Sequence, residues 1–264
     1  MDWEALMSHT KEWVIEAGEM IRSMSEKSIE VSTKVDDNDL VTNVDRAVEE
    51  FLVNKIRTQY PEHHIVGEEG YGDDIDSVEG IVWMIDPIDG TKNFVHLQRH
   101  FAISVGIYEG NIGQIGVIYD VMNDDLYLAK RGMGAYLNDT RMLPLKFRVP
   151  ITRSLLSVHI KHLMKNRFNL LSIVDQARGY RNIGCSAIEL AYVASGRLDG
   201  FISPPISMWD IAAGRIILEE VGGKLTQING CPIASQGKWR TSIIAANPYL
   251  YDELLFEMQQ TAIV

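Results

Sequence analysis

A short apolar run that ends in two aspartates constrains the fold more than any other part of the chain. Residues 81–85 have the length and β-branched content of a buried strand, and Asp86, Pro87, Asp89 and Gly90 follow closely. Because Pro87 fixes φ and Gly90 permits a tight turn, both aspartates should lie on a stiff bend. An Asx turn with a helix N-cap explains this pair as well as a cation site does, so the spacing alone leaves both open.

The composition is that of an ordinary globular protein. The chain has 264 residues, 46% of them hydrophobic and 23% charged, with a net charge of −11. This length allows one large domain or two small ones. We expect no direct nucleic-acid binding and no membrane contact, since both rely on basic patches or long apolar spans. No signal pattern opens the sequence, and we expect a cytoplasmic protein. A protein this acidic would have to recruit metal in order to handle phosphate.

The first half of the sequence predicts two amphipathic helices and an antiparallel sheet. The helices are expected at 3–24 and 45–60, and the strands at 65–66, 81–85, 101–108, 112–119 and 125–129. Asp45 would be the N-cap of the second helix. The stretch from Gly67 to Gly70 holds two acids between glycines, which favours a solvent-exposed turn.

After Pro150, strands alternate with helices, which favours a more parallel sheet. The strands are expected at 155–159, 180–183, 198–202, 224–228 and 243–246, and the helices at 168–177, 186–195, 209–218 and from 248 onward. No linker or repeat separates the halves, so we predict one domain over 1–264 with halves 1–150 and 151–264. Cys185 and Cys231 match no paired metal-ligand spacing and should be free thiols.

Three acidic motifs and one upstream segment resemble the inositol monophosphatase family. They are Gly67-Glu68-Glu69, Asp86-Pro87-Ile88-Asp89-Gly90-Thr91, Trp209-Asp210-Ile211-Ala212-Ala213-Gly214 and, upstream, Asp39-Leu40-Val41-Thr42-Asn43-Val44-Asp45. The likeness covers most of the chain. It implies an α/β fold, the layered αβαβα sandwich of the inositol monophosphatase and fructose-1,6-bisphosphatase type, with an antiparallel sheet in the first half and a mixed sheet in the second. It also implies Mg2+ dependence, lithium sensitivity and a homodimer.

The resemblance brings four carboxylates to one cavity, where they could not all stay ionised without cations. Hard oxygen ligands select Mg2+, which leaves room for phosphate oxygens. The resemblance assigns one metal to Glu68, Asp86 and the Ile88 carbonyl. A second metal is assigned to Asp86, Asp89 and Asp210. A third, weaker ion would lie near Glu68 and Glu69, so two or three ions are expected.

The implied reaction is the hydrolysis of a phosphate monoester by metal-activated water. The resemblance assigns catalysis to Asp45, Glu68 and Thr91: Thr91 would orient the water, Asp45 would accept the Thr91 hydroxyl proton, and Glu68 would hold a metal. The Gly90 and Thr91 amides would hold a phosphate oxygen.

The substrate implied by the resemblance is a small phosphorylated metabolite, first of all a myo-inositol monophosphate. The implied substrate-binding residues are Glu68, Ile88, Asp89, Gly90, Thr91, Arg181, Gly184, Cys185, Ser186, Ser203 and Asp210. Ser203 stands where typical members carry a glutamate that binds inositol hydroxyls, so a charge-assisted hydrogen bond is missing. Fructose 1,6-bisphosphate, NADP+, histidinol phosphate and 3′-phosphoadenosine 5′-phosphate are the alternative substrates, and a regulatory binding role is the alternative of another class.

Other polar residues near the motifs have a plainer explanation. Lys34 lies in a polar loop from which it would approach the metal site. Lys92 would add positive potential near the phosphate, although a solvated helix-surface lysine accounts for it as well. His96 and His100 are better explained by packing or exposure. Trp209 would pack so as to fix the aspartate beside it.

Overall fold

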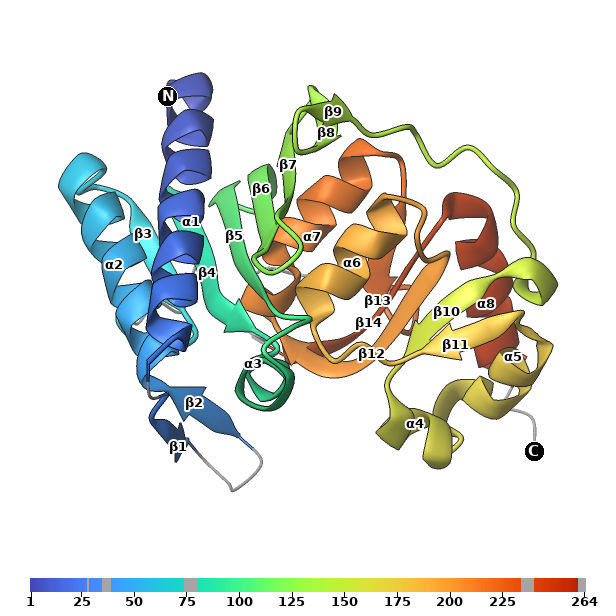
Figure 1. Ribbon diagram of the computed structural model, residues 1–264. Coiled ribbons are helices and arrows are strands. Elements are labelled where there is room, and N and C mark those ends of the chain that lie inside the picture. Colours follow the sequence, from blue (N-terminus) through green and yellow to red (C-terminus); the bar gives the residue numbers. More distant parts are fainter. Residues whose placement is uncertain (28, 35–38, 74–79, 234–239, 261–264) are drawn as a thin grey trace.

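The first half of the chain builds the larger of two sheets (Figure 1). The computed structural model describes residues 1–27, 29–34, 39–73, 80–233 and 240–260. The strands lie side by side in chain order, with β3 parallel to β4 and the later neighbours antiparallel. They are β3 (His64–Gly67), β4 (Ile81–Asp89), β5 (Ala102–Glu109), β6 (Ile112–Asp120), β7 (Asp125–Lys130), β8 (Gly134–Leu137) and β9 (Thr140–Arg141). The antiparallel meander is confirmed.

The second half builds a mixed sheet in the order β11-β10-β12-β14-β13. β10 is parallel to β11 and β12, and β14 is antiparallel to β12 and β13. The strands are β10 (Leu155–Val158), β11 (Gly179–Arg181), β12 (Gly200–Ser207), β13 (Lys224–Gln227) and β14 (Arg240–Ala246). The predicted mixed sheet is therefore confirmed.

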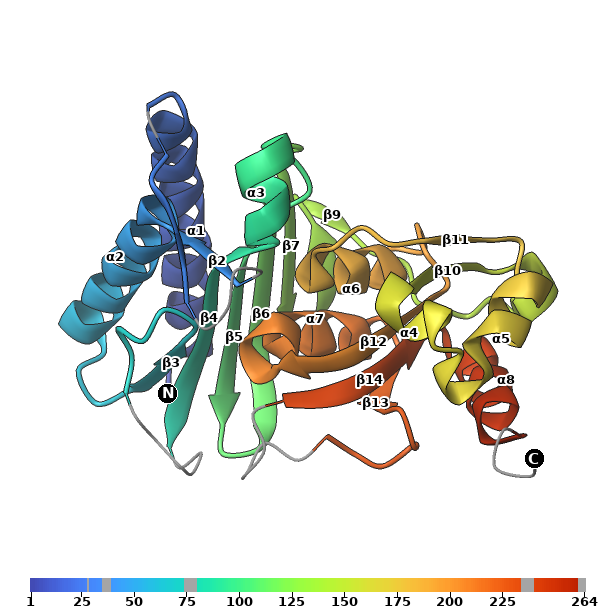
Figure 2. The ribbon, with the colours of Figure 1, turned by 90° about the horizontal axis from the view of Figure 1, so that it is seen from below.

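Helices cover both sheets and fill the space between them (Figures 1 and 2). Outside the larger sheet lie α1 (Trp3–Ser25) and α2 (Asn43–Gln59), between the sheets lie α6 (Ser186–Ala194) and α7 (Met208–Glu220), and outside the second sheet lie α5 (Leu170–Gln176) and α8 (Pro248–Gln259). Three apolar clusters follow these layers. One lies between α1, α2 and the larger sheet, one surrounds α6 and α7 between the sheets, and one lies between the second sheet and α5 and α8. The αβαβα sandwich is confirmed. Shorter elements at the margins are β1 (Val31–Thr33), β2 (Leu40–Thr42), α3 (Thr91–Leu97) and α4 (Ile160–Met164).

The apolar run of β4 is explained by burial on both faces of the strand. Trp83 and Ile85 belong to the cluster beneath α1 and α2, whereas Val82 and Met84 belong to the cluster around α6 and α7. Successive side chains of a strand point to opposite faces, so a strand between two helical layers needs apolar residues at every position. This burial places the end of β4 deep in the molecule.

Helix α7 lies unusually close to the larger sheet. A Cβ added at Gly106 of β5 would lie 2.6 Å from the Cβ of Ala212, and one added at Gly116 of β6 would lie 2.5 Å from the Ala213 carbonyl oxygen. Residues without side chains on the strands and small residues on the helix let the backbones approach. The start of α7 is thereby fixed against the sheet that carries β4.

Several local predictions are corrected by the structure. Asp45 is not the N-cap of α2; Thr42 is, and Asp45 sits three positions into the helix, where its carboxylate accepts the Thr42 N–H. The strand predicted to stop at residue 85 continues as β4 to Asp89 across a register shift. The helix predicted at 168–177 starts at Leu170, because residues 167–169 form a 3-10 turn. The pairing of β1 with β2 was not predicted, and residues 35–38 of that polar stretch lie outside the described residues.

Two further expectations concern the thiols and the membrane. Cys185 is buried, Cys231 is exposed, and both thiols are free, as predicted. Among the described helices, none combines the length and the hydropathy that crossing a bilayer requires.

Candidate active site

Three carboxylates from distant parts of the chain meet at the end of β4. Glu68 follows β3, Asp86 lies in β4, and Asp210 lies in the first turn of α7. One carboxylate oxygen of each lies within 4.8 Å of the others. They line a cavity of about 300 Å3, here called the acidic cavity, together with Asp39, Leu40, Ile88, Asp89, Gly90, Thr91, Lys92 and Gly184. All three acidic motifs therefore contribute to one cavity.

The bend at the end of β4 fixes two of the acids. The pairing with β5 shifts register between Asp86 and Asp89, and the Ile88 N–H donates to Asp86 Oδ1 at 3.0 Å. The N–H of Ala187, in the first turn of α6, donates to Asp89 Oδ2. Gly90 adopts a φ of 90°, and a Cβ there would lie 3.0 Å from a backbone oxygen, so only glycine fits. Backbone geometry, not a flexible loop, sets where these carboxylates lie.

Asp210 is fixed by the start of its own helix. The Ser207 N–H donates to Asp210 Oδ2 at 2.8 Å within a capping box. This arrangement satisfies the helix end and leaves the second carboxylate oxygen for the cluster. The neighbouring Trp209 packs against the core between the sheets, in agreement with its predicted packing role.

Burial and mutual repulsion favour the protonated forms of Asp86, Asp89 and Asp210 in the absence of a cation. Burial raises the pKa of Asp86 and of Asp89 well above the usual range, and the neighbouring carboxylates raise it further. Burial, followed by the charge of Glu68, raises the pKa of Asp210 to about 7. The clustered carboxyls would all ionise only if a cation were bound among them. Clustered carboxylate oxygens beside a backbone carbonyl are the donors that Mg2+ takes, so the residues present fit a divalent metal.

Lys34 already supplies one positive charge to the cluster. Its Nζ lies 2.8 Å from Glu68 Oε1 and 2.6 Å from Glu69 Oε1. Burial lowers the pKa of Lys34, but the two glutamates outweigh that effect and raise it overall. The Glu69 side chain is only 4% exposed, and burial raises its pKa to about 7. The prediction of a solvent-exposed turn is therefore wrong for Glu69, which Lys34 covers, whereas the Glu68 side chain is 23% exposed.

Glu49, which sequence reasoning missed, holds the turn that carries Glu68. Its carboxylate is fully buried and accepts the N–H groups of Glu69 at 2.8 Å and Tyr71 at 3.0 Å. A Cβ at Gly67 would lie 2.4 Å from it, so the turn packs directly on this carboxylate. The sequence places Glu49 four residues after Asp45, on the same face of α2, but this spacing alone does not distinguish a buried acid from an exposed one.

Asp45 and Thr91 form a hydrogen-bonded pair at the edge of the acidic cavity. The Thr91 hydroxyl lies 3.2 Å from Asp45 Oδ1 and 3.2 Å from the Ile88 carbonyl oxygen, and it can donate to either. The other Asp45 oxygen accepts the N–H and the hydroxyl of Thr42. Burial raises the pKa of Asp45. A buried carboxylate is thus in hydrogen-bond contact with a hydroxyl that lines the cavity.

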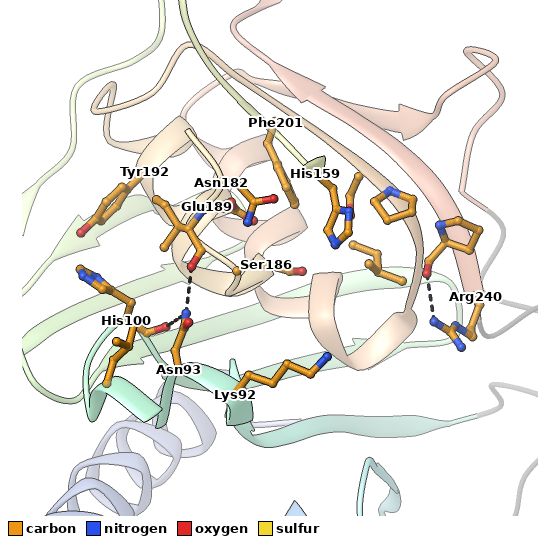
Figure 3. Close-up of a pocket in the computed structure, with 17 residues that line it drawn as sticks. Lys92, Asn93, His100, His159, Asn182, Ser186, Glu189, Tyr192, Phe201 and Arg240 are labelled. Atoms are coloured by element: carbon orange, nitrogen blue, oxygen red, sulfur yellow. Dashed lines mark hydrogen bonds between the residues drawn. The ribbon is translucent and has the colours of Figure 1, made fainter. Parts of the chain in front are cut away.

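A larger cavity of about 780 Å3 adjoins the acidic cavity and shares Lys92 and Gly184 with it (Figure 3). Ser186 and Ser203 of the predicted substrate contacts line it. The remaining lining residues are Asn93, Leu97, His100, His159, Asn182, Ile183, Glu189, Tyr192, Phe201, Pro204, Pro205, Ile206 and Arg240.

Two predicted substrate contacts do not reach either cavity with their side chains. Cys185 is fully buried against Gly90, and burial raises the pKa of its thiol. Arg181 lies on the edge strand β11 and donates to the Tyr180 carbonyl oxygen at 2.8 Å. Neither residue is among those that line the two cavities. Arg181 is exposed at this edge of the second sheet.

The layered sandwich and the carboxylate cluster at its centre are typical of an α/β phosphatase that works with a bound cation. The profile of the inositol monophosphatase family matches residues 2–263. Inositol-1-monophosphatase from Bacillus subtilis (strain 168) is 44% identical over 260 residues, which cover 97% of each chain. The chain therefore belongs to the inositol monophosphatase family and is a phosphatase.

The relatives include a protein that is not named as a phosphatase, besides further inositol monophosphatases. Nus factor SuhB from Pasteurella multocida (strain Pm70) is 35% identical over 258 residues, which cover 92% of this chain and 91% of that one. The solved structure of inositol monophosphatase II from Staphylococcus aureus MSSA476 has a TM-score of 0.88 at 37% identity, covering 98% of this chain and 96% of that one. The family is thus broader than one activity.

Proposed function

We propose that the chain is a Mg2+-dependent phosphate monoester hydrolase that converts myo-inositol monophosphate and water into myo-inositol and phosphate. The observation that supports this most directly is the meeting of Glu68, Asp86 and Asp210 within 4.8 Å. The 44% identity to an inositol-1-monophosphatase supports the choice of substrate. We also propose a single domain over 1–264, a cytoplasmic homodimer and inhibition by lithium.

The acidic cavity would hold two Mg2+ ions, or three. Glu68, Asp86 and the Ile88 carbonyl would hold one, and Asp86, Asp89 and Asp210 a second. When bound, such ions neutralise the phosphate and lower the pKa of water. Asp89 is not part of the closest group of carboxylates, but it lines the same cavity, and Asp210 raises its pKa, so their charges interact.

The chain's own residues would position the reactants. The Thr91 hydroxyl would orient the attacking water, and Asp45 would take up the proton that this hydroxyl passes on. The amides of Gly90 and Thr91 would bind a phosphate oxygen. Gly184, Ser186 and Ser203 would face the alcohol part of the substrate.

Ser203 offers a hydroxyl where a carboxylate would bind inositol more strongly, so the alcohol part of the substrate is tested separately. Initial rates of phosphate release with Mg2+ rank the candidates. The panel is myo-inositol 1-phosphate, fructose 1,6-bisphosphate, NADP+, histidinol phosphate and 3′-phosphoadenosine 5′-phosphate. If inositol 1-phosphate reacts no faster than the others, the inositol assignment is withdrawn and the phosphatase assignment stays.

Replacing Asp89 with asparagine tests the metal chemistry. We expect Asp89→Asn to reduce phosphate release by more than about 100-fold, since losing a residue behind the ligands already costs about 10- to 100-fold. The fold should persist, because burial disfavours the charge that is removed. Asp139→Asn is the control of equal charge, since the Asp139 side chain is 96% exposed. Retained activity in a folded Asp89→Asn protein, checked by circular dichroism, refutes the proposed ligand set.

A regulatory binding role is the second candidate, and the observation in its favour is the 35% identity to Nus factor SuhB. A strain that lacks the gene and carries the Asp89→Asn protein separates the two. Loss of the wild-type growth phenotype in that strain indicates that the phosphatase activity is what the cell needs. A phenotype rescued by the inactive protein indicates a binding role.

A further inference from the structure

The turn between β11 and α6 forms part of the wall of both cavities. Gly184 lines the acidic cavity and the larger cavity, and Asn182 and Ile183 line the larger one. Gly184 has a φ of 83°, a left-handed conformation that favours glycine. Ile183 is half-buried and Gly184 is exposed, so packing alone does not fix this turn. Its position nevertheless decides the shape of the wall that would face the alcohol part of a substrate.

Glu189, in the first turn of α6, is a buried acid that the carboxylate cluster and the proposed reaction do not use. It is 5% exposed, and its Oε1 accepts the Ser157 hydroxyl and, at 2.9 Å, the Ile183 N–H. Burial raises the pKa of Glu189, and hydrogen bonds from Ser157 and from the backbone of Ile183 and Gly184 partly oppose this. A buried carboxyl is costly unless it is hydrogen-bonded, so its bonds to the turn offset the cost of its burial.

Asn93 holds the same turn from a different helix. Its Nδ2 donates to the Ile183 carbonyl oxygen at 2.8 Å and to the His100 carbonyl oxygen at 2.9 Å, and Figure 3 shows both bonds. Asn93 belongs to α3, which begins at Thr91 beside the acidic cavity. The N–H of Ile183 is therefore bound by Glu189 and its carbonyl by Asn93. Two side chains from two helices fix one residue of the cavity wall.

We propose that Glu189 is a positioning residue for substrate binding: its carboxyl oxygens fix the backbone of Ile183 and Gly184, and this sets the affinity for the alcohol part of the substrate. The inference rests on the proposed function, because only a phosphate monoester held in the acidic cavity would bring its alcohol part to this wall. Glu189 acts as a hydrogen-bond acceptor and not as a charge. Without it, the partly exposed turn would rearrange so that its amides reach water.

Two uncharged variants of similar length test this role. Glu189→Met removes the acceptor but keeps a flexible side chain suited to a helix, whereas Glu189→Gln keeps one acceptor oxygen. The substrate is the member of the panel above that the wild type hydrolyses fastest with Mg2+. We expect KM to rise about tenfold in Glu189→Met and less than about threefold in Glu189→Gln. The inhibition constant of inorganic phosphate, which needs only the acidic cavity, should change less than about twofold in both.

Hydrogen–deuterium exchange of the metal-free protein, followed by mass spectrometry, gives a second readout that does not depend on activity. The peptide that contains Ile183 and Gly184 should exchange about tenfold faster in Glu189→Met than in the wild type, and Glu189→Gln should resemble the wild type. Ser157→Ala is the control, because it removes a partner of Glu189 and leaves the bonds to the turn. It should change KM by less than about twofold.

Four results would overturn the assignment in different ways. Unchanged KM and unchanged exchange in a folded Glu189→Met protein refute the positioning role. An equal rise of KM in Glu189→Gln and Glu189→Met shows that the charge matters and not the acceptor, and an equal rise in Ser157→Ala shows that the turn is not the cause. Absence of phosphate release from the whole panel by the wild type refutes the proposed function instead, and the exchange rates then still decide whether Glu189 fixes the turn.

Discussion

Glu49 shows how a side chain outside the carboxylate cluster can fix the position of one of its members. Its carboxylate accepts the N–H groups of Glu69 and Tyr71, which follow Glu68 closely in the chain. Each buried N–H that loses its acceptor costs about 1–3 kcal/mol. The turn would therefore rearrange when Glu49 is removed, and the oxygen that Glu68 offers to a metal would move with it.

We predict that Glu49→Ala raises the Mg2+ concentration needed for half-maximal activity by about tenfold, as other changes behind metal ligands do. Glu49→Gln keeps one acceptor and should give a smaller increase. The effect on kcat at saturating Mg2+ should be the lesser one in both variants. The measurement is phosphate release against Mg2+ concentration, and the control is Glu50→Gln on the exposed side of the same helix. An unchanged Mg2+ dependence in a folded Glu49→Ala protein contradicts the positioning role.

The acids on the β4 bend could be predicted from sequence, and Glu49 could not, for a physical reason. Asp86 and Asp89 follow a local pattern of apolar strand, proline and glycine that needs no distant partner. The partners of Glu49 are amides about 20 residues away, and an acid in an amphipathic helix usually faces water. The edge position of β11, which carries Arg181, likewise depends on how the whole second sheet assembles.

At the level of elements, the position of Asp210 depends on the packing of α7 against β5 and β6. We predict that Gly106→Ala destabilises the fold by about 1–3 kcal/mol, because the new methyl group would lie 2.6 Å from the Ala212 Cβ and 2.8 Å from its carbonyl carbon. Displacement of α7 should also weaken Mg2+ activation.

Thermal unfolding and Mg2+ titration of activity measure these two effects. Gly179→Ala is the matched control, because its Cβ would lie 3.5 Å from Leu155 Cδ1, an ordinary contact, and should change stability by no more than about 0.5 kcal/mol. Equal stability of the Gly106→Ala and wild-type proteins would show that α7 can shift away from the sheet at no cost.

The order of the elements was largely predictable, but their ends were not. Periodicity located α1, α2 and the meander because long apolar stripes outweigh local detail. The end of β4 was misplaced because a register shift lets Asp86 and Asp89 stay in the strand while Pro87 contributes no N–H. The N-cap of α2 was misplaced because Thr42 and Asp45 can each cap a helix, and only the capping box of the folded chain distinguishes them.

At the scale of the whole molecule, the buried carboxyls couple metal binding to stability and pH. The pKa of Asp210 and that of Glu69 are about 7, and those of Asp86 and Asp89 are well above the usual range. In the unfolded chain such groups titrate near pH 4. Between these values the folded, metal-free protein binds more protons than the unfolded chain, so its free energy of unfolding decreases as pH rises.

We predict that the melting temperature of the chelator-treated protein falls between about pH 5 and about pH 8, and that Mg2+ raises it more at the higher pH, since the metal replaces protons. Scanning calorimetry across this range measures both effects. Asp210→Asn should reduce the pH-dependent fall. A melting temperature independent of pH, or a larger Mg2+ effect at the lower pH, would contradict the protonated state of the cluster.

The placement of α6 and α7 between the sheets has a consequence for synthesis of the chain. The strands of the larger sheet are complete by residue 141, but the helices that cover their inner face end only at Ala194 and Glu220. While the ribosome makes the intervening residues, that apolar face stays open to water. We therefore expect a nascent chain whose residues up to about 150 have left the ribosome to be retained by chaperones, and one whose residues up to 220 have left it to be released from them.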